Sequence, residues 1–194
     1  MVNHKYKCIF VHIPRTSGTS IESEFGFDMD FKDGKKSINP YLPSDSDKHL
    51  KASEIFNSIS KDLWGDYFKF TIVRNPWDRV ISIFHMPAFG DINALSKKSL
   101  SYFLSHYQPK PQERGVQCMD YIDRADLDFI GKFENRQQDT NFIFKKIGFL
   151  GAQNMHNRKT NHKHYTEYYD DETRQIVAER YAKDIEYFGY KFGE

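Results

Sequence analysis

The chain has 194 residues, a length that fits one domain with a sizeable core. Its 28 Lys and Arg residues nearly balance its 27 Asp and Glu residues, so no global basic field attracts nucleic acid or a membrane surface. Aromatic side chains make up 16% of the residues, which favours a packed globular domain over disorder. We therefore expect one domain over residues 1–194, in which any anion site is local.

Cysteine usage and hydropathy exclude several further classes of protein. The two cysteines, Cys8 and Cys118, show no metal-type spacing, and the pair His162 and His164 is too short a motif to indicate zinc. No apolar run reaches 18 residues, and no leader-like apolar region precedes the first predicted strand. We expect a cytoplasmic protein with reduced thiols, no metal, and neither membrane nor nucleic acid as a partner.

The first candidate site follows the first predicted strand. Residues 6–13 are rich in β-branched and aromatic side chains, which is typical of a strand buried on both faces of a parallel sheet. Thr19 and Glu22 have the spacing of a capping box, which predicts a helix that begins near Thr19. The connecting loop is rich in hydrogen-bond donors and consists of Pro14, Arg15, Thr16, Ser17, Gly18, Thr19 and Ser20.

This loop has the composition of an anion-binding loop. Backbone N–H groups at the start of a helix are unpaired, and the helix dipole adds partial positive charge there. Arg15 supplies a full charge, the four hydroxyls supply donors, and Gly18 lets the backbone approach a ligand. The G-x-x-x-x-G-K-[ST] pattern of nucleotide triphosphate loops is absent. The alternative is an ordinary connecting turn, because Pro, Ser, Thr and Gly are common in turns.

A second junction of the same kind follows residues 67–73, which also have the pattern of a buried strand. Asn75 is a typical N-cap, so a helix is predicted immediately after it. Arg74 lies at the end of the strand, and Arg79 and Ser82 lie on the polar face of the helix. Ligands of open α/β sheets bind at the carboxyl ends of strands, so the two junctions predict a ligand with two separated anionic groups. For Arg79, a solvated surface charge is an equally good interpretation.

The remaining segments complete an α/β pattern. A long loop over residues 26–48 ends at His49, just before an apolar-faced helix over residues 52–59. A lone histidine at such a position is more often a solvated residue or a cap than a catalyst. The other predicted elements are a helix over 94–107, a loop over 108–118, a strand over 128–134, a helix after Asn135 and a last helix capped by Asp170.

A polar tract over residues 154–165 precedes the last helix. It contains Arg158 and Lys159, whose positive charges are suited to closing over an anion. Its alternative interpretation is a solvated loop.

With both junctions identified, the chain resembles the PAPS-dependent sulfotransferase superfamily, in the branch of carbohydrate O-sulfotransferases and their small bacterial relatives. The matching segments are FVHIPRTSGTS (residues 10–20), TIVRNPWDRVIS (71–82), FIGKFEN (129–135), and the run from His164-Tyr165 to Tyr168-Tyr169-Asp170. They occur in the family's order and span nearly the whole chain.

The resemblance implies an α/β, P-loop-kinase-like three-layer fold with a central parallel sheet flanked by helices. It also implies 3′-phosphoadenosine 5′-phosphosulfate (PAPS) as the sulfuryl donor and 3′-phosphoadenosine 5′-phosphate (PAP) as the product. By analogy, residues 14–20 bind the 5′-phosphosulfate, Arg74 and Ser82 bind the 3′-phosphate, and Arg158 with Lys159 belongs to a loop that closes over the donor.

By the same analogy, His49 matches the family's general base, and its ordinary pKa of about 6.5 suits that role. Arg15 occupies the position where the family usually has lysine, and an arginine stabilises charge but does not give up a proton. The implied reaction is in-line transfer of the sulfuryl group to a hydroxyl, for which a saccharide acceptor is one candidate.

Two other functions remain open at the level of sequence. A phosphotransferase or nucleotide kinase uses the same kind of strand–loop–helix anion site, although the Gly-Lys-Ser/Thr pattern is missing. A module that binds PAPS or PAP without catalysis is the second alternative.

Overall fold

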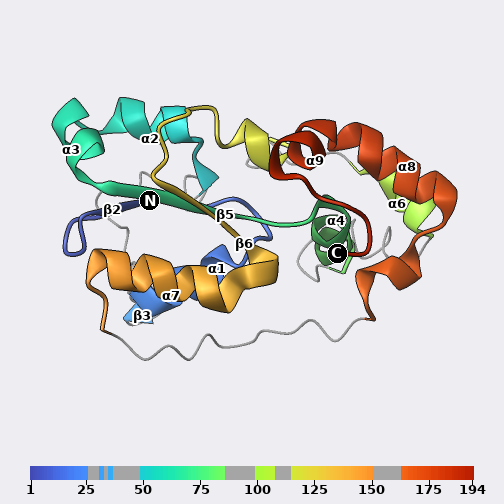
Figure 1. Cartoon of the computed structure of the whole chain (residues 1–194), viewed down its shortest axis with the longest axis horizontal. Coiled ribbons are helices and arrows are strands. Elements are labelled where there is room, and N and C mark those ends of the chain that lie inside the picture. The colour runs from blue at the N-terminus through green and yellow to red at the C-terminus, as the bar shows by residue number, and fades with distance from the viewer. Residues whose placement is uncertain (26–30, 33–34, 37–48, 86–98, 108–114, 151–162) are drawn as a thin grey trace.

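The structure is a computed structural model that describes residues 1–25, 31–32, 35–36, 49–85, 99–107, 115–150 and 163–194 (Figure 1). Within these ranges the elements are, in order, β1 (Val2–Asn3), β2 (Cys8–Val11), α1 (Gly18–Phe25), β3 (Phe31–Lys32), β4 (Lys35–Lys36), α2 (Ala52–Ser58), α3 (Lys61–Asp66), β5 (Phe68–Val73), α4 (Pro76–Phe84), α6 (Leu100–His106), η2 (Cys118–Asp120), β6 (Phe129–Lys132), η3 (Phe133–Asn135), α7 (Arg136–Ile147), η4 (Tyr165–Tyr168), α8 (Asp171–Arg180) and α9 (Ala182–Phe188).

The central sheet has the strand order β1-β2-β5-β6. β2 pairs in parallel with β5, and β5 pairs in parallel with β6, so three strands run in one direction. β1 pairs antiparallel with β2, which makes the sheet mixed instead of fully parallel as expected. The reason is the short connection over residues 4–7, in which Lys7 has φ 47°, because so short a turn joins only antiparallel strands.

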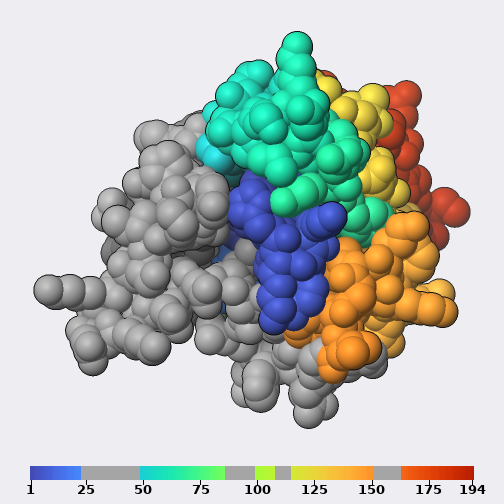
Figure 2. Space-filling view, turned by 90° about the vertical axis from the view of Figure 1, so that its left-hand side faces the viewer, coloured from blue at the N-terminus to red at the C-terminus, as the bar shows by residue number. Residues whose placement is uncertain are grey.

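Helices cover both faces of this sheet, as predicted (Figure 1). Side chains alternate between the faces along each strand. One face packs against α1 and α7 through Cys8, Phe10, Ile21, Phe70, Ile72, Ile143 and Phe144. The core on the opposite face, beneath α2 and α3, includes Ile9, Val11, Ala52, Ile55, Trp64 and Val73. Figure 2 shows the N-terminal segment at the surface between α3 and α7.

The remaining helices, α4, α6, α8 and α9, lie beyond the carboxyl ends of the strands (Figure 1). α4 begins as predicted, since the Asn75 side chain accepts the Trp77 N–H at 3.1 Å. The predicted last helix begins after Asp170 but is interrupted at Tyr181, so it forms two helices. Of the predicted helix over 94–107, residues 94–98 lie outside the described residues. Among the described helices, none is long and apolar enough to cross a bilayer.

Arg79 of α4 connects the sheet to these outer helices. Its side chain is buried, and it donates to the carbonyls of Pro14 at 2.9 Å and Val116 at 2.7 Å. Its burial excludes the solvated surface charge that was one of the two interpretations of the sequence. Asp184 of α9 is also buried; its carboxylate attracts Arg79 and accepts two backbone N–H groups. Burial raises the pKa of Asp184, against those hydrogen bonds.

We predict that Asp184→Asn lowers the free energy of unfolding by about 2–3 kcal/mol, because an amide leaves one buried N–H group without an acceptor. Urea unfolding measures this change. Asp171→Asn is the matched control, since its side chain is 95% exposed, and a change within about 0.5 kcal/mol is expected there. Equal stability of the two variants would contradict a bracing role for Asp184.

Candidate functional site

Each of the three parallel strands delivers an arginine to the same edge of the sheet. β2 is followed by Arg15, β5 by Arg74, and β6, after one 3-10 turn, by Arg136. Because the strands run parallel in register, the segments that follow them meet at this edge. The structure therefore brings the two predicted junctions together and adds a third.

The loop after β2 has an unusual backbone. Arg15 has φ 68° and Ser17 has φ 76°, in the left-handed region that side-chain-bearing residues rarely adopt. The Thr16 hydroxyl between them donates to the Ile13 carbonyl at 2.9 Å. The Ser17 carbonyl accepts the N–H groups of Ser20 and Ile21 in α1, a helix that begins at Gly18, one residue before the predicted start. The loop is thus shaped by its own hydrogen bonds.

Burial divides the loop residues into two groups. Arg15, Ser17 and Ser20 are partly exposed and Thr19 is exposed, so their polar atoms reach solvent. Pro14 and Thr16 are buried, and their oxygen atoms serve the inner structure. The Thr16 hydroxyl thus contacts a backbone carbonyl here, and its role as a donor for a ligand stays a prediction.

The predicted subsites for the two anionic groups adjoin each other. The Arg15 guanidinium donates to the Ser82 hydroxyl through Nε at 3.0 Å and Nη2 at 2.8 Å. Arg74 donates to the Arg15 carbonyl at 3.1 Å. Three residues from two strand junctions therefore form one connected cluster.

Arg74 is held in place by further contacts. Its Nε donates to Asp78, one turn into α4, at 2.8 Å. Its guanidinium lies over the Phe133 ring, 3.9 Å from the centroid. Only 8% of Arg74 is exposed, so its charge is fixed in position before any ligand binds.

His49 is attached to the other side of the loop. Its Nδ1 lies 2.9 Å from the His12 carbonyl oxygen, and the two imidazole rings meet edge to face at 4.4 Å. A carbonyl oxygen only accepts, so Nδ1 carries the proton and Nε2 carries the lone pair in the neutral ring. The His12 carbonyl thus fixes which ring nitrogen of neutral His49 carries the lone pair.

His12 lies beneath this arrangement. It is 2% exposed, forms an ion pair with buried Glu22 of α1, and stacks on Phe10. A Cβ atom at Gly18 would overlap the His12 ring, so the ring packs directly against the loop backbone. His12 therefore contacts both His49 and the loop that follows β2.

Two predicted site residues lie outside the described residues, and three residues found near the site were not predicted from the sequence. Arg158 and Lys159 fall in the range 151–162, outside the described residues. Arg136, His12 and Glu22 were not identified as site residues. The signal for Arg136 was available, because it follows the third predicted strand as Arg15 and Arg74 follow the first two. Within the described part of the chain, no group of three acidic, His or Cys side chains is placed to hold a metal ion.

We predict that Gly18→Ala lowers stability by about 1–3 kcal/mol, because the methyl group displaces the His12 ring. Thermal unfolding measures the effect. Gly65→Ala is the control: its added methyl meets nothing within 4 Å in α3, and a small gain in stability is expected. An unchanged melting temperature for Gly18→Ala would contradict the close packing of ring and loop.

Comparison with known proteins agrees with the resemblance seen in the motifs. A family model described as "Sulfotransferase family" matches residues 1–191. Carbohydrate sulfotransferase 9 from Homo sapiens is 26% identical over 175 aligned residues, covering 71% of this chain and 37% of the relative. The chain thus spans little more than a third of that relative's length. No solved structure matches the chain significantly. Because the family match extends over nearly every residue, the chain belongs to the sulfotransferase family.

Proposed function

We propose that this chain transfers a sulfuryl group from PAPS to an acceptor hydroxyl. The observation that carries the proposal is the connected cluster of Arg15, Arg74 and Ser82 at the carboxyl ends of parallel strands. Membership of the sulfotransferase family supports a sulfuryl donor as the ligand of this cluster.

The residues present fit a donor with two anionic groups. The loop after β2 offers backbone N–H groups at the start of α1 together with Arg15, and this set suits the phosphosulfate end. Arg74 and Ser82 lie on and just before α4 and suit the 3′-phosphate. When the donor binds, the Arg15–Ser82 contact is replaced by contacts with the donor. Arg15 then binds the phosphosulfate, and Ser82 binds the 3′-phosphate.

PAPS supplies a sulfuryl group joined to a phosphate leaving group. The protein's part is to bind both anionic ends, align the acceptor hydroxyl with the S–O bond that breaks, and accept the hydroxyl proton. Arg15 and the loop amides stabilise the negative charge on the transferring group. Arg15 remains protonated throughout, so it acts by charge and hydrogen bonding and not as a general acid.

His49 is the proposed general base. Its Nδ1 is occupied by the His12 carbonyl, so Nε2 is the atom that takes the proton of the acceptor hydroxyl. The human relative is a carbohydrate sulfotransferase, and this supports a saccharide hydroxyl as the acceptor.

PAP binding tests the donor site. We expect PAP to bind the wild-type protein in calorimetry, ATP not to compete, and Arg74→Ala to weaken binding about 10–100-fold through the loss of a charged donor. Arg174→Ala is the control, because this arginine is half exposed on α8. Absence of PAP binding, or a preference for ATP with Mg²⁺, would overturn the proposal in favour of a kinase.

Loss of the base is the second test. His49→Gln should lower the transfer rate from labelled PAPS to a panel of saccharides by about 10²–10⁴-fold and leave PAP affinity unchanged. His106→Gln is a matched control, since its Nδ1 also bonds a backbone carbonyl but lies exposed on α6. Full activity of His49→Gln, with His106→Gln also active, would exclude His49 as the base.

A further inference from the structure

We infer that Arg136 is a third cation of the donor site and that it binds the 5′-phosphate side of the nucleotide. This inference rests on the proposed function. It concerns a residue outside the two motifs that suggested the donor site.

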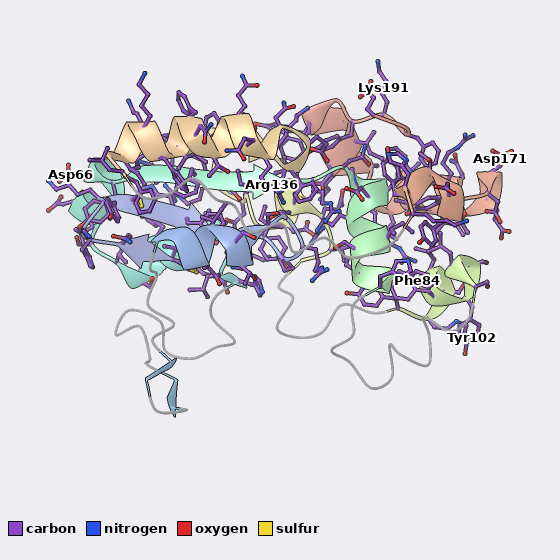
Figure 3. The ribbon with its side chains drawn as sticks, turned by 90° about the horizontal axis from the view of Figure 1, so that it is seen from below. Asp66, Phe84, Tyr102, Arg136, Asp171 and Lys191 are labelled. Atoms are coloured by element: carbon purple, nitrogen blue, oxygen red, sulfur yellow. The ribbon has the colours of Figure 1, made fainter. Side chains whose placement is uncertain are left out.

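The position of Arg136 follows from the pairing of β6 with β5. β6 ends opposite the end of β5, where Lys132 is the register partner of Val73. One 3-10 turn then leads to Arg136, the first residue of α7. Figure 3 shows Arg136 at the end of α7 nearest to α4. The third parallel strand thus places a guanidinium beside the two found from the sequence.

Arg136 contacts the anion loop itself. Its Nη1 donates to the Ser17 hydroxyl at 3.3 Å. Arg15 of the same loop extends in another direction, to Ser82 of α4. The loop is therefore contacted by α7 at Ser17 and by α4 through Arg15. This contact with Ser17 assigns Arg136 to the phosphosulfate end of the donor.

Two guanidinium groups share one aromatic ring at this place. Arg74 lies 3.9 Å and Arg136 lies 5.3 Å from the centroid of Phe133. The face of an aromatic ring attracts cations, so Phe133 holds two like charges near each other. Burial, and then the charge of Arg74, lower the pKa of Arg136, which shows the repulsion between them. A bound anion would offset that repulsion.

The nearby carboxylates are engaged with backbone groups. Glu134 accepts the Asn75 N–H at 2.6 Å, and Asp139 accepts the Lys132 N–H at 2.6 Å. A positive side chain at the first position of a helix also opposes the helix dipole. The charge of Arg136 thus lies at the start of α7, in contact with the loop that follows β2.

Binding of three nucleotides, PAP, 5′-AMP and 3′-AMP, distinguishes the two ends of the donor site. We expect Arg136→Gln to weaken PAP and 5′-AMP binding about 10–100-fold in calorimetry, with 3′-AMP unchanged, because one charged donor to the 5′-phosphate is lost. Arg74→Ala should weaken PAP and 3′-AMP binding and leave 5′-AMP binding unchanged. Arg136→Lys should recover part of the affinity, and Arg174→Gln should behave as wild type.

The outcomes distinguish this inference from the proposed function. If wild type binds PAP and Arg136→Gln binds it equally well, the inference is wrong and the proposed function stands. A loss confined to PAP and 3′-AMP would overturn the assignment to the 5′ side. If wild type binds no PAP, the proposed function itself fails. Melting curves without nucleotide check that each variant folds. If Arg136→Gln is unstable, Arg136→Lys and a folded Arg136→Ala variant replace it. Wild-type affinity of both variants for 5′-AMP would overturn the inference.

Discussion

The parallel alignment of β2, β5 and β6 is the constraint on which the site depends. Paired in register, these strands end at one edge of the sheet, and residues far apart in the sequence meet there. The contact between Arg15 and Ser82 spans 67 positions, and the contact between Arg136 and Ser17 spans 119. Backbone hydrogen bonding between strands, and not any local motif, therefore determines which charges lie together.

α4 contributes to this edge in two separate ways. One side of this helix carries Asp78, which accepts from Arg74, and Ser82, which accepts from Arg15. Its inner side holds Arg79, which bonds carbonyls on two other segments and is attracted by buried Asp184. The helix α4 thus presents polar groups to the site, and its buried Arg79 holds the loop after β2 through the Pro14 carbonyl. The buried charge of Arg79 therefore has a structural role.

Local signals predicted the first two junctions because their causes are local. The N-cap of α4 at Asn75, and the buried strands before Arg15 and Arg74, depend on neighbouring residues alone. The burial of Arg79 and the support of His49 by His12 depend on which distant segments pack together, so sequence patterns left them open. The antiparallel β1 was missed because two residues are too short to show an alternating pattern. Arg158 and Lys159 stay predictions.

The left-handed backbone at Arg15 and Ser17 has a thermodynamic consequence for ligand capture. Such conformations are unfavourable for these residue types, so the folded protein maintains them through the rest of its packing. The conformational entropy of the loop is then lost when the chain folds and not when a ligand binds. Association with an anionic ligand at this loop should accordingly be fast and require little rearrangement of the backbone, with specificity residing in the spacing of fixed charges.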